Sequence, residues 1–179
     1  MTDHRAPPAF EMPAALASLG FAVRPETDDD VPFLMALYVS TRTEELAPVP
    51  WTAAQKVAFL AGQFHAQRQH YRTHIPACAF LVIERNGAPV GRLYLEPRQT
   101  QLHLVDVALT PDQRGAGVGT ALLKALIERA HREGKAVGIF VEHFNPALRL
   151  YRRLGFTEIQ DTGVYLEMEL TPDLAAAAG

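Results

Sequence analysis

The sequence predicts a single α/β (α+β) domain whose strands and helices follow the order β-α-α-β-β-β-α-β-α-β-β. Short apolar runs alternate with segments whose apolar residues recur at helical spacing, which is typical of a sheet covered by helices. The 179 residues have the length of roughly one domain, which needs no disulfide or metal to fold. No internal repeat or low-complexity linker divides the chain. We therefore expect one domain over residues 21–170, with residues 1–20 as an N-terminal extension and 171–179 as a C-terminal tail, both outside the core.

The first part of the domain is predicted to be one strand followed by two helices. The strand covers Phe21 to Arg24, and Thr27 with the three aspartates that follow it supplies an N-cap and an acidic first turn for a helix that continues to Tyr38. A second helix begins at Thr52 and continues to about residue 70, with helical apolar spacing. Its apolar positions are Val57, Leu60, Ala61 and Phe64.

The middle of the chain reads as three strands and an amphipathic helix. Residues 80–84 and 89–96 form a hairpin around Asn86-Gly87, a dipeptide that tolerates the positive φ of a tight turn. A third strand covers residues 102–109, and a helix that ends at Gly134 follows it. The apolar positions of this helix are Val118, Ala121, Leu122, Ala125, Leu126 and Ala130, which share one face.

The last part alternates again between strand and helix. Residues 136–141 form a short buried strand, and a helix over residues 146–154 follows, with Asn145 as its N-cap and Pro146 at its first position. Strands over residues 156–159 and 165–170 close the sheet around Gly163.

Charge and apolar content exclude several classes of partner. The chain has 17 Lys and Arg against 20 Asp and Glu, a net charge of −3, so it lacks the basic surface that nucleic acids or anionic membranes require. No apolar run reaches the roughly 18 residues of a membrane span, and the first residues do not resemble a secretory signal. We expect a cytoplasmic protein that binds neither nucleic acid nor membrane.

The cysteine and histidine content gives no metal site. Cys78 is the single cysteine, which excludes an internal disulfide and a cysteine-based zinc site and favours packing in a core strand. His65, His70 and His74 suggest a metal site because the last two are four residues apart on a possible helix, but there is no H-E-x-x-H motif and no obvious third ligand. We interpret them as a solvated face and expect no metal.

A glycine-rich turn, Gln113 to Thr120, lies between a strand and a helix. Its glycines let the backbone approach a ligand, and the first N–H groups of the helix together with the helix dipole favour a phosphate. The turn lacks the lysine of a P-loop, and a dinucleotide fingerprint fits poorly because Thr120 stands where its last glycine would be. The turn predicts an anion site of another kind.

Two motifs in order identify a family resemblance. The first is R-x-x-G-x-G at Arg114, Gly117 and Gly119, and the second, N-x-x-x-x-L-Y-x-x-x-G-F, runs from Asn145 to Phe156. Together they resemble the GNAT superfamily of acetyl-CoA-dependent N-acetyltransferases. The resemblance implies a mixed, mostly antiparallel sheet of six to seven strands flanked by about four helices, although the first 75 residues match only in arrangement.

The resemblance also implies roles in binding acetyl-CoA. The main chain at Val107 and Leu109 would pair with the pantetheine arm like an extra strand, and Asn145 would contact the same arm. The side chain of Arg114 would either reach a phosphate or remain a solvated turn residue. The backbone N–H groups that would bind the pyrophosphate are those of Arg114, Gly115, Ala116, Gly117, Val118, Gly119 and Thr120.

Two residues are candidates for catalytic roles, Tyr151 from the family resemblance and His103 from its place on a predicted strand. Tyr151 would be the general acid that meets the departing CoA thiolate, the alternative being a core tyrosine. For the general base, His103 and Glu96 lie near the strands that flank the cleft. Alternation along the strand gives His103 the same side-chain direction as Val107 and Leu109, so we choose His103 as the base candidate. The alternative, an exposed strand histidine without a catalytic role, stays open.

The acceptor side is less defined. Glu44, Glu45 and Trp51 lie between the first two helices, where they could attract a cationic amine, although they can also be ordinary surface residues.

Asp106 lies inside an apolar strand and needs a partner, for which Arg92 is the leading candidate.

The sequence therefore favours an N-acetyltransferase that moves the acetyl group of acetyl-CoA directly to a primary amine of a small molecule or a protein. Two alternatives stay open: an acyl-CoA-binding sensor or interaction module without turnover, and a domain that binds another phosphate ligand. A homodimer is plausible, and the sequence does not identify the acceptor.

Overall fold

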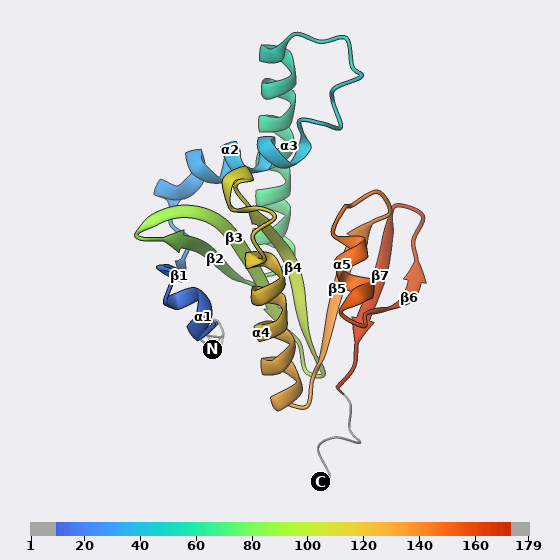
Figure 1. Cartoon of the computed structure of the whole chain (residues 1–179). Helices are drawn as coiled ribbons and strands as arrows, with labels where there is room; N and C mark the ends of the chain where they lie inside the picture. Colours follow the sequence, from blue (N-terminus) through green and yellow to red (C-terminus); the bar gives the residue numbers. More distant parts are fainter. Residues whose placement is uncertain (1–9, 173–179) are drawn as a thin grey trace.

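The computed structural model describes residues 10–172 and contains one seven-stranded sheet in the order β1-β2-β3-β4-β5-β7-β6 (Figure 1). Every neighbouring pair is antiparallel except β4 and β5, which are parallel, so the predicted mixed, mostly antiparallel sheet and its order of elements are confirmed. The strands are β1 (Phe21–Pro25), β2 (Ala79–Arg85), β3 (Ala88–Pro97), β4 (Gln101–Leu109), β5 (Ala136–Glu142), β6 (Thr157–Asp161) and β7 (Tyr165–Leu170). The helices are α1 (Ala14–Ala17), α2 (Val31–Arg42), α3 (Ala53–His74), α4 (Val118–Arg132) and α5 (Leu148–Arg153), with 3₁₀ turns at Asp28–Asp30 and Pro111–Gln113.

Helices cover both faces of the sheet. Leu93, Leu95 and Ile139 pack with α4 and α5 in the main apolar core. The side chains of β3 that alternate with these leucines point to the opposite face. There Tyr94 contacts Tyr71 of α3, and Arg92 donates to Gln67 of α3. Figure 1 shows the same arrangement, with α4 in front of the sheet and α3 behind it.

The two halves of the sheet meet at β4 and β5 and then separate. These strands pair only from Gln101 to Leu104 on β4 and from Ala136 to Ile139 on β5, whereas β4 continues to Leu109 and β5 to Glu142. Beyond the paired part, the backbone groups on the inner edges of both strands are not used by the sheet. The strands diverge at this point like the arms of a V (Figure 1).

A β-bulge in β4 corrects one expectation. Asp106 pairs with Tyr94 while Leu104 pairs with the next residue of β3, Leu95, so Val105 is an extra residue without a partner. The extra residue reverses the alternation of side chains beyond it. His103 therefore shares a face with Asp106, on the α3 side, and not with Val107 and Leu109 as the simple alternation predicted.

The ends of the domain depart from the prediction in one respect. Phe10 and Leu16 are buried in the main core, so residues 10–20 do not lie outside it as expected. Their apolar side chains cover the core beside β1, which the Ala- and Pro-rich composition did not reveal. The rest of the expected extension and tail, residues 1–9 and 173–179, lies outside the described residues.

Two helices differ from their predicted limits. The last helix begins at Leu148, with Ala147 and not Asn145 at the N-cap position. The Asn145 side chain still accepts a hydrogen bond from the Ala147 N–H at 2.9 Å, as a capping asparagine does, in the turn just before the helix. The second predicted helix, α3, is longer than expected and ends at His74.

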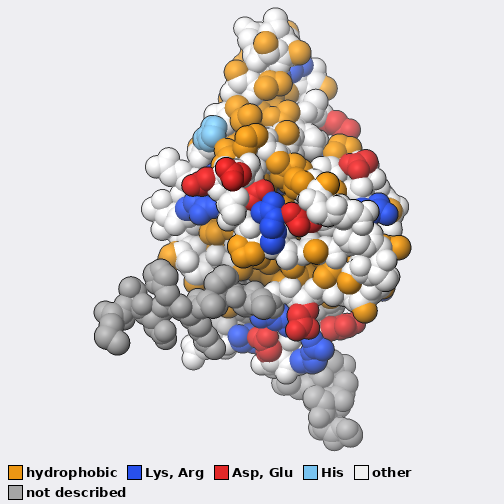
Figure 2. Space-filling view, turned by 90° about the vertical axis from the view of Figure 1, so that its left-hand side faces the viewer, with side chains coloured by type: hydrophobic (Ala, Val, Ile, Leu, Met, Phe, Trp, Pro, Cys, Tyr) orange, Lys and Arg blue, Asp and Glu red, His pale blue; other side chains and the backbone are white. Residues whose placement is uncertain are grey.

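The outer part of α3 and the loop before it project beyond the sheet (Figure 1). Val57, expected in the core, is 49% exposed there, and Trp51 and Phe59 are exposed beside it. Figure 2 shows hydrophobic side chains spread over this projecting end. Between residues 10 and 172, no helix has the length and apolar content to cross a membrane.

Candidate active site

The glycine-rich turn leads β4 into α4 with free backbone donors. Gly117 is the N-cap of α4 with φ of +82°, a left-handed conformation that side chains other than glycine's rarely adopt. Ala121 makes the first helical bond, to the Gly117 carbonyl, and within residues 10–172 the N–H groups from Gly115 to Thr120 have no backbone acceptor. A Cβ atom on Gly115 or Gly117 would meet nothing within 4 Å. The turn thus presents several N–H groups and the positive end of a helix to open space, as an anion site requires.

Arg114 fixes this turn to its surroundings. Its Nε donates to the Leu109 carbonyl at 2.8 Å, and its Nη2 donates to Ser40 Oγ of α2 at 3.0 Å. Its own N–H donates to the Pro111 carbonyl at 3.3 Å. The side chain is therefore neither free nor simply solvated, and it ties the turn to β4 and α2.

The inner edge of β4 is open along the diverging segment. Thr110 donates its N–H to the Val90 carbonyl of β3 at 2.9 Å, and because backbone groups alternate in direction, those of Leu109 and Val107 point away from β3. The bond from Arg114 to the Leu109 carbonyl agrees with this direction. Val107 and Leu109 thus turn their polar backbone groups toward the gap between β4 and β5.

Tyr151 of α5 lies in the main core on the α4 side of the sheet. Its ring meets Phe156 edge-on at 5.7 Å, and its hydroxyl has no hydrogen-bond partner among the residues described. Burial and the carboxylate of Asp106 raise the pKa of Tyr151 to about 12, so the hydroxyl stays protonated at neutral pH. It can donate a proton or a hydrogen bond.

A cavity of about 720 Å³ opens on the opposite, α3 side of the sheet. Its walls come from α2, α3, the diverging parts of β4 and β5, and β7. Aromatic and polar side chains dominate it, and its two arginines and two glutamates balance in charge. It is lined by Tyr38, Arg42, Glu45, Gln63, Ala66, Gln67, His70, Tyr71, Ile75, Arg98, His103, Val105, Phe140, Glu142 and Tyr165.

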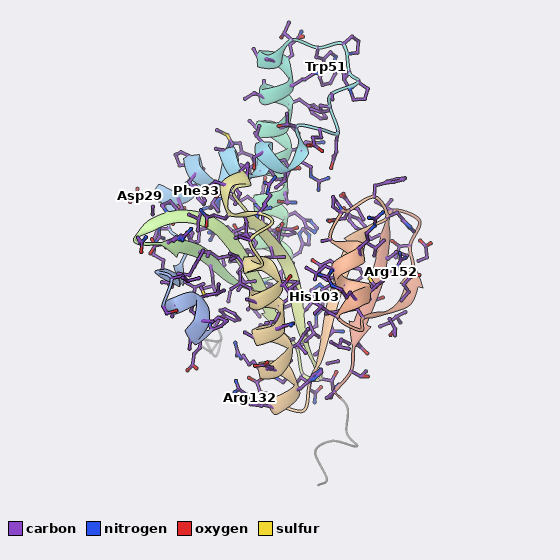
Figure 3. The ribbon with its side chains drawn as sticks, in the orientation of Figure 1. Asp29, Phe33, Trp51, His103, Arg132 and Arg152 are labelled. Carbon is purple, nitrogen blue, oxygen red and sulfur yellow. The ribbon has the colours of Figure 1, made fainter. Side chains whose placement is uncertain are left out.

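His103 is the predicted base candidate that lines this cavity. Only 5% of the residue is exposed, its ring meets Phe140 of β5 at 5.2 Å, and its buried Nδ1 has no hydrogen-bond partner. Burial and the positive charge of Arg98 lower the pKa of His103 to about 4, so the imidazole is neutral at pH 7. Figure 3 shows His103 next to the point where β4 and β5 separate.

Of the other residues predicted as base or acceptor contacts, only Glu45 lines the cavity. Glu96 pairs with His103 across the strands but binds Arg98 at 2.8 Å and does not line the cavity. Glu45 lines the cavity, whereas Glu44 does not. Trp51 lies at the projecting end of the loop (Figure 3), where its ring contacts Phe59 at 5.3 Å, because α3 carries that loop away from the sheet.

The sequence analysis missed an ion pair across the cavity. Arg42, the last residue of α2, donates to both carboxylate oxygens of Glu142, the last residue of β5, at 3.0 to 3.2 Å. Arg42 also donates to Glu45 at 3.1 Å. The two partners are 100 residues apart, and no local pattern in the sequence pairs them.

The expected partner of Asp106 is confirmed. Arg92 donates to Asp106 at 2.7 Å, and both side chains are largely buried. The Arg92 guanidinium also lies over the Tyr94 ring at 5.2 Å. This pair lies on the same face of the sheet as His103, and Arg92 also donates to Gln67, which lines the cavity.

The three histidines of α3 and the cysteine are exposed and buried respectively, as expected, although His70 also lines the cavity. His65, His70 and His74 are exposed, and His70 stacks on His74 at 4.4 Å. Cys78 is buried just before β2, and burial raises the pKa of its thiol to about 12. In the described part of the chain, no group of three or more His, Cys, Asp or Glu could hold a metal ion.

Comparisons with known proteins show the family to which the chain belongs. Residues 41–156 match the model of the acetyltransferase (GNAT) family. An uncharacterized N-acetyltransferase of Methanocaldococcus jannaschii is 35% identical over 101 residues, covering 50% of this chain and 43% of that protein. An N-alpha-acetyltransferase of Sulfurisphaera tokodaii is 33% identical over 99 residues, covering 46% of this chain and 58% of that one.

The similarity to these relatives thus spans about half of their length. Among solved structures, PaiA N-acetyltransferase from Thermoplasma acidophilum, determined in complex with coenzyme A, matches with a TM-score of 0.63 at 14% identity over 84% of this chain and 98% of that one. That likeness concerns the fold, whereas the family model covers more than half of the sequence. The chain belongs to the GNAT acetyltransferase family.

Proposed function

We propose that this protein transfers the acetyl group of acetyl-CoA directly to a primary amine of a small molecule or a protein. One observation carries the proposal: β4 and β5 separate beyond Leu104 and Ile139, with the free N–H groups of the glycine turn at the end of β4 and a polar cavity on the α3 side. A donor held along β4 and an acceptor held in the cavity would therefore meet where the strands part. Membership of the GNAT family supports the same reading.

The donor would be bound mainly by the backbone. The pyrophosphate would sit on the N–H groups between Gly115 and Thr120, where the helix dipole adds to the hydrogen bonds. The amide groups of the pantetheine arm would pair with Val107 and Leu109 as an added strand. This mode of binding explains how a chain with a net charge of −3 can hold an anionic cofactor.

Transfer would proceed by attack of the neutral amine on the thioester carbonyl. The new C–N bond forms as the carbonyl electrons move to oxygen, and collapse of this intermediate breaks the C–S bond and releases the CoA thiolate. Tyr151 would donate to that thiolate. With a pKa of about 12 against about 8.5 for a thiol, full proton transfer in the ground state is uphill by roughly 5 kcal/mol, so its hydroxyl would act mainly through a hydrogen bond to the developing charge.

The acceptor must lose a proton, and His103 would receive it. Its Nδ1 is free and its imidazole is neutral at pH 7. An ammonium with a pKa of about 10.4 is too weak an acid to protonate His103 before attack. The nitrogen becomes more acidic once it has attacked, and His103 would take the proton at that stage.

Thiol release from acetyl-CoA across a panel of amines tests the proposal. We expect Tyr151→Phe to reduce kcat about 100-fold or more, because a positioned acid contributes about 10²–10⁴-fold, while the Kd for CoA measured by calorimetry stays unchanged. Equal turnover by the purified variant would remove Tyr151 from the reaction. Binding of acetyl-CoA without thiol release for any amine would instead favour the sensor alternative.

A further inference from the structure

The cavity on the α3 side of the sheet has an acidic end that the transfer chemistry does not use. Glu142, the last residue of β5, and Glu45, in the loop after α2, both line the cavity. The pairing of β4 with β5 ends at Ile139, and Glu142 lies three residues beyond it, or about 10 Å along the strand. The acidic end is therefore separated from the point where the strands part and the acetyl group would be transferred.

The two glutamates of this end share one guanidinium. Arg42 donates to both carboxylate oxygens of Glu142 at 3.0 to 3.2 Å and to Glu45 at 3.1 Å. The other arginine that lines the cavity, Arg98, precedes β4 and donates to Glu96 at 2.8 Å. The acidic end thus has two carboxylates for one cation, so a second cation would balance its charge.

Aromatic rings next to these carboxylates add to the preference for a cation. Tyr165 pairs with Glu142 across the sheet, Phe140 lies two residues before Glu142 on the same face, and both line the cavity. The guanidinium of Arg42 lies 5.7 Å from the centroid of the Tyr38 ring. The face of an aromatic ring attracts a positive charge, most strongly where water is partly excluded. Arg42 thus shows which chemistry this part of the cavity accommodates.

A separate feature indicates that the cavity holds a ligand. His103 lines the cavity and is only 5% exposed, yet its Nδ1 has no hydrogen-bond partner among residues 10–172. Buried polar atoms in folded proteins are nearly always hydrogen-bonded. The buried histidine therefore indicates a polar ligand at the level of the cavity from which β4 and β5 diverge.

We propose that Glu142 and Glu45 form a specificity site for a second cationic group of the acceptor, which replaces Arg42 as the partner of Glu142. The inference rests on the proposed function, in that an amine of the acceptor reacts beside His103. The acceptor would be a primary amine that carries an ammonium or guanidinium group at the other end of a flexible chain. Arg42 would keep its bond to Glu45, so that each carboxylate then has one cation.

Thiol release from acetyl-CoA with three amines of equal chain length tests this assignment on the full chain. Pentane-1,5-diamine, pentylamine and 5-aminopentanoate share one primary amine and differ in whether the other end is cationic, apolar or anionic. We expect kcat/KM for the diamine to exceed that for pentylamine about tenfold or more, beyond the factor of about two that its two equivalent amines give. The aminopentanoate should be the poorest of the three, because its carboxylate would face Glu142.

Substitution of Glu142 identifies the carboxylate responsible. Glu142→Gln should lower the ratio of diamine to pentylamine to about two by raising the KM for the diamine. A ratio is measured because both amines meet the same protein, so a loss of folded enzyme cancels. Glu44→Gln is the matched control: it removes the same charge from the loop after α2, but Glu44 is exposed and does not line the cavity. It should keep the tenfold ratio.

The exchange with Arg42 has a test of its own. Arg42→Met removes the cation that competes for Glu142, so we expect the KM for the diamine, relative to that for pentylamine, to fall about threefold or more. An arginine that only supports the packing of α2 would leave this relative KM unchanged or raise it. Either of those results would overturn the exchange.

The outcomes separate this inference from the proposed function. Equal kcat/KM for the diamine and pentylamine, or a tenfold ratio that survives Glu142→Gln, overturns the specificity site and leaves the transferase intact. A preference for 5-aminopentanoate also overturns it, because Arg42 would then bind the carboxylate of the acceptor. Thiol release only with amines that lack a second cation has the same consequence. If no amine releases thiol, the proposed function is wrong and the specificity site fails with it.

Discussion

Two buried titratable residues on β4 avoid an isolated charge in different ways. Asp106 is paired with Arg92, which donates to its carboxylate at 2.7 Å. His103, on the same face, has no partner for its Nδ1 and stays neutral instead, with its pKa lowered to about 4 by burial and by the positive charge of Arg98. A neutral imidazole beside the acceptor cavity can accept a proton, and the same burial makes protonation costly to the fold.

This cost predicts a pH dependence of stability. The unfolded pKa of a histidine is about 6.5, so between pH 6.5 and 4 the unfolded chain binds a proton that folded His103 does not, and stability falls as the pH drops through this window. From pH 7 to pH 5 the expected loss is about 2 kcal/mol in urea denaturation. Asp30, whose pKa is held far below its usual range by a hydrogen bond from Arg24, contributes a loss only below about pH 4.

Substituting His103 tests whether this histidine causes the pH dependence of stability. His103→Gln should remove most of the difference between pH 7 and pH 5, whereas His65→Gln, which alters an exposed histidine of α3, should leave it in place. An unchanged slope in the His103 variant would show that this imidazole titrates normally in the folded protein.

At the scale of elements, both ends of α4 carry a glycine in the left-handed region with open space around it. Gly117 precedes the helix with φ of +82°, and Gly134 follows it with φ of +68°. A glutamate at either position should therefore cost about 1–2 kcal/mol of backbone strain. Only Gly117→Glu should abolish CoA binding in calorimetry, because its carboxylate would face the pyrophosphate site. Equal CoA binding by both variants would contradict the placement of the cofactor at this turn.

Some elements could be predicted from the sequence because their signals are local. The hairpin at Asn86-Gly87 and the helix from Val118 are specified by turn residues and by spacing within a few positions. The motifs around Gly117 and Tyr151 were likewise visible. The bulge at Val105 was not, because it arises from the pairing of β4 with β3. That single extra residue moved His103 to the other face relative to Val107.

At the scale of the whole molecule, the two halves of the sheet share few contacts near the site. β4 and β5 pair over only four residues, and the acceptor cavity extends from His103 in this paired part to Val105 and Phe140 beyond it. The ion pair between Arg42 of α2 and Glu142 of β5 connects the halves across the cavity. The two residues are neighbours because α2 packs over the first half of the sheet, so the sequence alone could not indicate this ion pair. A contact between elements that are far apart in the chain therefore forms part of the cavity wall.

A double-mutant cycle tests this connection. Arg42 binds Glu142 through both carboxylate oxygens, and the two side chains are 25% and 30% exposed. We therefore expect a coupling free energy of about 1–2 kcal/mol. It is measured by urea denaturation of Arg42→Met, Glu142→Gln and the double variant. The matched cycle with Glu45→Gln should give about 0.5 kcal/mol or less, because Glu45 is 58% exposed and solvent screens its charge. Coupling of similar size in both cycles would mean that Glu142 is only one more surface partner of Arg42. A larger value for Glu142 would instead show that this ion pair stabilises the packing of α2 against β5, at the side of the cavity where donor and acceptor are proposed to meet.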